Sequence, residues 1–156
     1  IAAINGAIAG LAGITPASGY VSVEHAFVIG VGIGIASYLG VIFLKERLRI
    51  DDALDVSSVH GVAGIIGSLA IGIFASTLIN PTGPNGLLYG HPQQLLIQAI
   101  GVGVAGLMGF GGTFGIMKVI DVLIGVRVSS ETEDKGLDIE EHAESAYNDE
   151  GEFGKI

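Results

Sequence analysis

The sequence has no cysteine and few charged side chains. Without cysteine, neither a disulfide framework nor a thiol-based metal site is available. Charged residues make up 15% of the chain, against about a quarter in an ordinary globular domain. Hydrophobic residues make up 49%, so much of this chain is expected to meet something other than water.

The longest stretch without charge runs from Val56 to Met117 and contains no Asp, Glu, Lys or Arg. It is too long for one helix and is broken by Asn80-Pro81 and His91-Pro92. A membrane-crossing helix needs about 20 apolar residues. A helix of a soluble protein would have a charged or polar face, which this stretch lacks. The strands of a membrane β-barrel would be shorter and would alternate in polarity. We therefore predict an all-α, polytopic transmembrane bundle with spans at about residues 1–15, 26–44, 56–78 and 93–125.

The ends of the chain differ in character. No secretory signal is visible, and the chain begins with Ile1 inside an apolar segment, so we expect a fragment or a chain whose N-terminal part has been removed. Residues 1–127 form the predicted membrane part. Ten of the 16 acids lie after residue 128, so residues 128–156 form an acidic tail that composition alone predicts to be disordered.

Basic residues predict the orientation. The loops at 16–25 and 79–92 contain no Lys or Arg, whereas all seven fall on the other side: three in the loop at 45–55, two in the tail, and Lys118 and Arg127 near the end of the fourth span. The second side is expected to be cytoplasmic, which places the tail in the cytoplasm of a multi-pass cell-membrane protein.

Glycine is frequent, with 26 residues. Pairs four apart occur at Gly6 and Gly10 and at Gly30 and Gly34, and a third pair lies at 111 and 115. Gly61, Gly64 and Gly67 recur at intervals of three. Small residues let helix backbones approach closely in lipid. These glycines predict a tight bundle or contacts between subunits.

His60 is the polar residue that most needs an explanation. It lies near the start of the third predicted span, where an ionisable group is costly and faces the bundle interior or a water-filled path. We expect it to be buried. Two interpretations stay open, a structural hydrogen bond between helices and a role in moving a small molecule or a proton. Val56 lies four residues earlier on the same helical face.

The aspartates before His60 have a plain interpretation. Asp51, Asp52 and Asp55 precede a helix start, where carboxylates satisfy free N–H groups. A cation site near Asp52 is the weaker alternative. His25, His91 and His142 are interpreted as exposed. No metal-ligand spacing, phosphate loop or catalytic constellation is visible, so we expect no metal, no cofactor and no enzyme activity.

Three motifs resemble the ammonium transporter (Amt/Mep/Rh) family. The run from Asp51 to Gly64, with Val59-His60-Gly61 inside it, is similar to the start of that family's tenth membrane helix. The run from Gly10 to Ala17 resembles its eighth helix. The tail segment from Gly136 to Tyr147 resembles its C-terminal motif. Ser57 and Ser58 stand where the family often has Phe-Gly, and Ala143 where it often has Gly.

The resemblance implies the last four helices of an eleven-helix fold. His60 corresponds to the second of two pore histidines, Val56 to a pore-lining position and Asp52, with Asp55 nearby, to a structural acid. The implied regulatory tail residues are Gly136, Asp138, His142, Glu144 and Tyr147. The implied function is passage of ammonium or ammonia through a narrow apolar pore, in a homotrimer within a lipid bilayer.

Two other functions remain open, and neither involves nucleic acid. The first is a regulatory fragment whose tail binds a P-II signalling protein at the cytoplasmic face. The second is part of an unrelated inverted-repeat transporter.

Overall fold

The computed structural model describes residues 2–145, and this part of the chain is helical with no strand. Three helices are long and apolar enough to cross a membrane: Val23–Arg47, Ser57–Phe74 and Gln93–Ile124. A shorter apolar helix covers Ala3–Ala17. The predicted all-α, polytopic architecture is confirmed.

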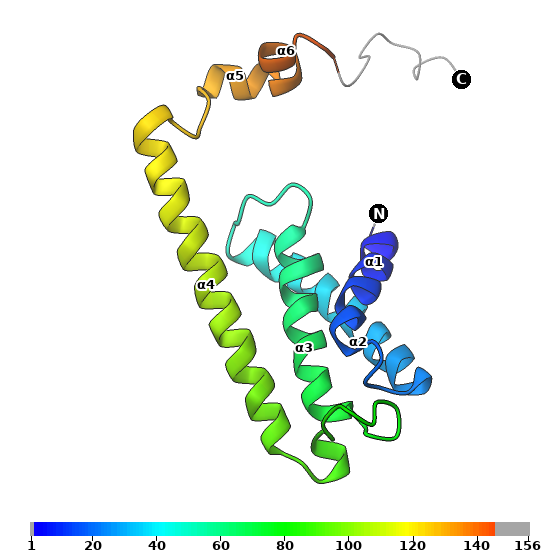
Figure 1. Ribbon diagram of the computed structural model, residues 1–156. Helices are drawn as coiled ribbons and strands as arrows, with labels where there is room; N and C mark the ends of the chain where they lie inside the picture. The colour runs from blue at the N-terminus through cyan, green and yellow to red at the C-terminus, as the bar shows by residue number, and fades with distance from the viewer. Residues whose placement is uncertain (1, 146–156) are drawn as a thin grey trace, which may run out of the picture. The chain divides into compact units, whose positions relative to one another are not determined.

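Helices α1 (Ala2–Ile14) and α2 (Val23–Ile42) pack as an antiparallel pair (Figure 1). A 3₁₀ turn, η1 (Thr15–Ala17), follows α1. The backbone N–H of His25 donates to the Ser22 hydroxyl, so α2 starts at Val23, before the expected residue 26. Glycines make the close approach of the pair possible. A Cβ on Gly10 would lie 2.8 Å from the Gly30 carbonyl oxygen, and one on Gly34 would lie 2.9 Å from that of Gly6.

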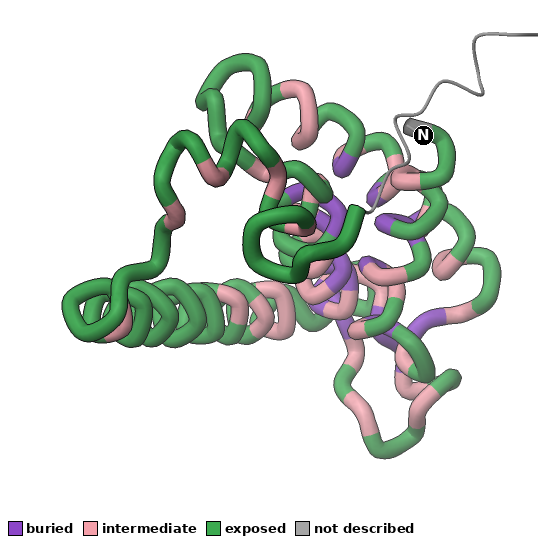
Figure 2. Tube along the Cα trace, turned by 90° about the horizontal axis from the view of Figure 1, so that it is seen from above, coloured by how far each residue is buried: buried purple, intermediate pink, exposed green. Residues whose placement is uncertain are grey.

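The third helix packs against both α1 and α2. It starts as a π-helical segment, η3 (Ser57–Val62), and continues as α3 (Ala63–Phe74). A Cβ on Gly67 would overlap the Gly13 carbonyl oxygen, so these two backbones are in direct contact. Figure 2 shows the buried residues gathered where these helices meet. The largest fully buried side chains are Ile33, Ser37 and Ser58.

The third helix ends at Phe74 rather than at the expected residue 78. Ala75 takes an extended backbone with ψ 141°, and the Ser76 N–H donates to the Tyr20 carbonyl at 2.9 Å. The chain then forms an ordered loop in which the Thr77 N–H donates to the Asn85 side chain at 2.8 Å. A 3₁₀ turn, η4 (Leu87–Tyr89), completes this loop. Long-range hydrogen bonds therefore stop the helix although the sequence remains apolar.

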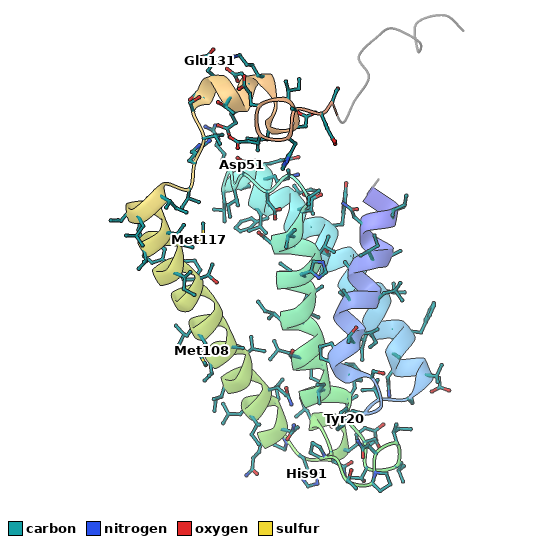
Figure 3. All side chains as sticks on the ribbon, turned by 45° about the horizontal axis from the view of Figure 1, so that its top comes forward. Tyr20, Asp51, His91, Met108, Met117 and Glu131 are labelled. Atoms are coloured by element: carbon teal, nitrogen blue, oxygen red, sulfur yellow. The ribbon has the colours of Figure 1, made fainter. Side chains whose placement is uncertain are left out.

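Helix α4 (Gln93–Ile124) follows Pro92 and has no buried residue. Its two methionines, Met108 and Met117, are labelled in Figure 3. Contacts divide the chain into two compact units, Ile1–Met108 and Gly109–Ile156, and the boundary between these units falls inside α4.

Composition predicted a disordered tail, but the described part of the tail contains two short helices, α5 (Ser130–Lys135) and α6 (Leu137–His142). The Ser129 hydroxyl accepts from the Thr132 N–H at 3.1 Å and caps α5. Lys135 pairs with Glu131 one turn away and with Glu140 of α6, both at 3.1 Å. Local capping and ion pairs thus order a segment that is mostly polar.

Candidate functional site

His60 lies on the exposed side of η3, so the expectation that it is buried is wrong for the described structure. The buried side of this helix is occupied by Ser58, Val59 and Ala63, which face α1 and α2. The reason is rotational: a helix that buries residues 58 and 59 turns the next residue away from the bundle.

The surface around His60 is open and made of small or apolar residues. Val56, just before η3, is 49% exposed. A Cβ added to Gly61 or to Gly64 would meet no atom within 4 Å. Val56, His60 and Gly64 are spaced by four residues and so lie near one helical face. The result is an apolar strip in which the imidazole is the polar group.

Asp52 caps the helix that carries His60. Its Oδ1 accepts from the Val56 N–H at 3.0 Å and its Oδ2 from the Ser57 N–H at 2.7 Å. The hydrogen bond from the Ser57 backbone, with smaller contributions from the Ser57 side chain and the Val56 N–H, lowers the pKa of Asp52. The predicted capping role is confirmed at Asp52. Both carboxylate oxygens hold backbone donors, which leaves the cation-site alternative unsupported.

Asp55 does something other than capping. Its side chain, 15% exposed, turns to the neighbouring helices: Oδ1 lies 2.7 Å from the Lys45 ammonium, and Oδ2 accepts from Asn5 at 3.1 Å. Oδ1 has no other partner among the described residues, so the ion pair alone satisfies it. The prediction of a side-chain cap is wrong here, because Asp52 already holds the free N–H groups. Asp51, labelled in Figure 3, is exposed in the same loop.

Ser58 and Gly40 hold the start of this helix against α2. The buried Ser58 hydroxyl donates to the Ser37 carbonyl at 2.6 Å. A Cβ on Gly40 would lie 2.5 Å from the same hydroxyl oxygen. Neither Ser58 nor Asn5 was predicted to hold helices together. The available signal for both residues was a polar side chain within an otherwise apolar helix. Their hydrogen-bond partners lie 21 and 50 residues away along the chain, and such distant partners cannot be identified from one sequence.

The other histidines differ from one another. His25 was expected to be exposed but is half-buried, with its ring 5.1 Å from that of Phe74 and its Nδ1 3.3 Å from the Ser22 hydroxyl. His91 and His142 are exposed, as expected. Within residues 2–145, no three His, Asp or Glu side chains gather in a way that could hold a metal ion.

The proposed tail residues lie around α6. Gly136 joins α5 to α6 with φ +101°, a backbone conformation that favours glycine. Asp138 is half-buried, and its carbonyl accepts from the Glu144 N–H at 3.0 Å. His142 and Glu144 are exposed at the end of α6, and Tyr147 lies outside the described residues. Ala143 ends α6 in the left-handed conformation, φ +54°, where glycine is more readily accommodated.

Known proteins are similar to this chain over nearly its whole length. The model of the Ammonium Transporter Family matches residues 1–147. The chain belongs to the ammonium transporter family. Ammonium transporter 1 of Dictyostelium discoideum is 50% identical over 95% of the chain and 32% of its own length. Ammonium transporter Amt1 of Archaeoglobus fulgidus is 45% identical over 92% of the chain and 36% of its length. Membership rules out an unrelated inverted-repeat transporter.

Solved structures of the family share the fold. Mep2 of Saccharomyces cerevisiae superposes with a TM-score of 0.73 at 38% identity, over 80% of this chain and 29% of that one. A structure described as a sensor Amt protein gives 0.77 at 33% identity, over 86% and 32%. This family member is thus a polytopic helical membrane protein, and it spans about a third of the length of the curated relatives it matches.

Proposed function

We propose that this chain forms part of the wall of an ammonium-conducting pore, with His60 and Val56 facing the transported molecule. The observation that carries the proposal is the exposed imidazole on an apolar, membrane-length helix. An ionisable group on such a helix is costly unless it faces protein or a polar path. Family membership supports ammonium or ammonia as the molecule that uses this path.

The chemistry of the strip fits a small hydrogen-bonding molecule. A neutral imidazole offers one donor and one acceptor. Val56, Gly61 and Gly64 add no competing polar side chain. Conduction needs binding that is weak enough for release, and one imidazole in apolar surroundings meets this requirement. The activity is transport, without covalent chemistry.

Substitution of His60 tests the proposal in the natural protein that contains this sequence. We expect His60→Ala and His60→Asp to change the flux of ammonium or methylammonium, measured per molecule in the membrane. His91→Ala, in an exposed loop, is the matched control and retains normal flux. Normal flux in both His60 variants would rule out the pore role.

Assembly and orientation belong to the same proposal. We place the protein in the cell membrane as a homotrimer, with the loop at 45–55 and the tail in the cytoplasm. The distribution of Lys and Arg between the loops supports this orientation. The free glycine pair at 111 and 115, where added Cβ atoms meet nothing within 4 Å, supports contacts with other helices.

A second proposal concerns the tail, which we assign to the docking of a P-II signalling protein. The supporting observation is that the described tail is folded into two short helices, the first capped by Ser129 and joined to the second by the Lys135–Glu140 ion pair, and so presents a defined surface. The residues concerned are Gly136, Asp138, His142, Glu144 and Tyr147. A pull-down with and without residues 128–156 tests it: binding that persists without the tail would exclude docking there.

A further inference from the structure

We propose that Asp55 is a positioning residue for His60, which it holds in place by joining three helices at one point. The inference rests on the proposed role of His60 in conduction. Asp55 is the last residue of the loop before the helix that carries His60, and its carboxylate and its carbonyl engage different segments.

The side chain of Asp55 joins α1 to the end of α2. Asn5 of α1 donates to Oδ2 at 3.1 Å. Lys45 lies on η2 (Phe43–Arg47), the π-helical continuation of α2, and its ammonium is 2.7 Å from Oδ1. The carboxylate is largely buried, so this ion pair is screened less than a surface pair.

The backbone of Asp55 starts the third helix. Its carbonyl accepts from the Ser58 N–H at 3.1 Å and from the Val59 N–H at 2.8 Å. His60 is the next residue in the same π-helical segment. The direction of the His60 ring therefore depends on where Asp55 is fixed, and Asp55 is fixed by Asn5 and Lys45.

The positioning role of Asp55 differs from helix capping, because a different aspartate, Asp52, caps this helix. Asp52 already holds the Val56 and Ser57 N–H groups. Asp55 has φ +57°, in the left-handed region that costs energy for residues other than glycine. A glycine would fit this backbone better, and an aspartate here is explained by what its carboxylate contacts.

The first experiment measures position directly, independently of transport. The chain has no native cysteine, so the thiol of His60→Cys is a clean reporter within it. We expect Asp55→Gly, which suits the backbone but removes the carboxylate, to change the rate at which this thiol reacts with a maleimide. Asp51→Gly, in the same loop, is the matched control and leaves the rate unchanged. An unchanged rate with Asp55→Gly overturns the inference.

The second experiment measures flux per molecule in the membrane of the natural protein, with His60 present. We expect Asp55→Gly and Lys45→Met to lower maximal flux roughly three- to tenfold, the size of a coupling between contacting residues, with little change in KM. Lys45→Arg keeps the charge and retains normal flux. The Lys45 side chain is 40% exposed, so Lys45→Met is expected to disturb folding less than Asp55→Gly. It therefore tests the same ion pair if Asp55→Gly lowers the amount of protein.

The outcomes separate the two proposals. Normal flux in both Asp55→Gly and Lys45→Met, alongside a defect in His60→Ala, overturns the positioning role and leaves the pore role standing. Normal flux in His60→Ala and His60→Asp removes the pore role and the inference with it. Loss of protein amount with normal flux per molecule indicates a purely structural ion pair and also overturns the inference.

Discussion

At the scale of single residues, glycines on one helix have opposite surroundings. Gly67 contacts the backbone of α1 so closely that no Cβ fits against the Gly13 carbonyl. Gly64, one turn earlier, faces open space. The sequence interval of three therefore mixes glycines required for packing with glycines on the exposed strip beside His60.

This contrast predicts the effects of two alanine substitutions. Gly67→Ala forces α1 and α3 apart and is expected to lower the free energy of unfolding by about 1–3 kcal/mol, the usual cost of overpacking. Gly64→Ala is expected to be neutral or to stabilise by up to about 1 kcal/mol, because alanine favours the helix. Thermal unfolding in detergent compares them. Equal stabilities would contradict the direct backbone contact.

At the scale of elements, three of the described helices are capped by different side chains at their starts. Ser22 caps α2, Asp52 caps the helix of His60 and Ser129 caps α5. The cap at Asp52 depends on charge, because an ionised carboxylate accepts two backbone N–H groups at once.

The lowered pKa of Asp52 predicts a pH dependence. Because the pKa is lower in the folded state than in the unfolded state, the stabilising contribution is complete above the ordinary aspartate pKa, about 3.9. It is lost as the pH falls below that value and through the lowered pKa. Thermal midpoints measured between about pH 3 and pH 6 are expected to fall less steeply in Asp52→Asn than in the unchanged protein. Asp51→Asn serves as the control, and an identical slope in Asp52→Asn would count against the cap.

Sequence reasoning succeeded where local properties decide the structure. Long apolar runs and prolines predicted the helices, and the position of Asp52 before an apolar run predicted its cap. It failed where distant partners decide. The end of α3 is set by the contact between Ser76 and Tyr20, and the direction of the Asp55 carboxylate is set by Asn5 and Lys45.

The same distinction between local properties and distant partners applies to the candidate site. His60 and Val56 stood out because a polar residue within an apolar span is conspicuous in the sequence. Whether His60 is buried depends on which face of its helix α1 and α2 cover, and that face was not readable. In the tail, capping by Ser129 and ion pairs with Lys135 outweighed an overall polar composition.

At the scale of the whole molecule, large apolar side chains cover the exterior. Within unit Ile1–Met108, side chains such as Val23, Phe27 and Leu39 are more than half exposed. In a bilayer such exposure carries no penalty, because lipid tails are as apolar as leucine. The loops at the two ends of the bundle then lie on opposite sides of the membrane: Figure 3 labels Asp51 at one end and Tyr20 and His91 at the other.

This arrangement predicts which loop residues a membrane-impermeant thiol reagent reaches. Leu54 and Leu78 are a matched pair, being leucines in opposite loops with exposures of 81% and 88%. We expect Leu78→Cys to be labelled in intact cells and Leu54→Cys only after permeabilisation. Labelling of both in intact cells, or of Leu54→Cys alone, would contradict the orientation.

The backbone contacts between α1, α2 and α3 also limit how this bundle evolves. Where two side chains touch, loss of volume on one helix can be compensated by gain on the other, and the two positions covary. Where a Cβ at Gly67 would meet the carbonyl of Gly13, the obstacle is the main chain, which no substitution on the partner removes. Such positions are expected to remain glycine independently of their neighbours, whereas side-chain contacts beside them drift in pairs.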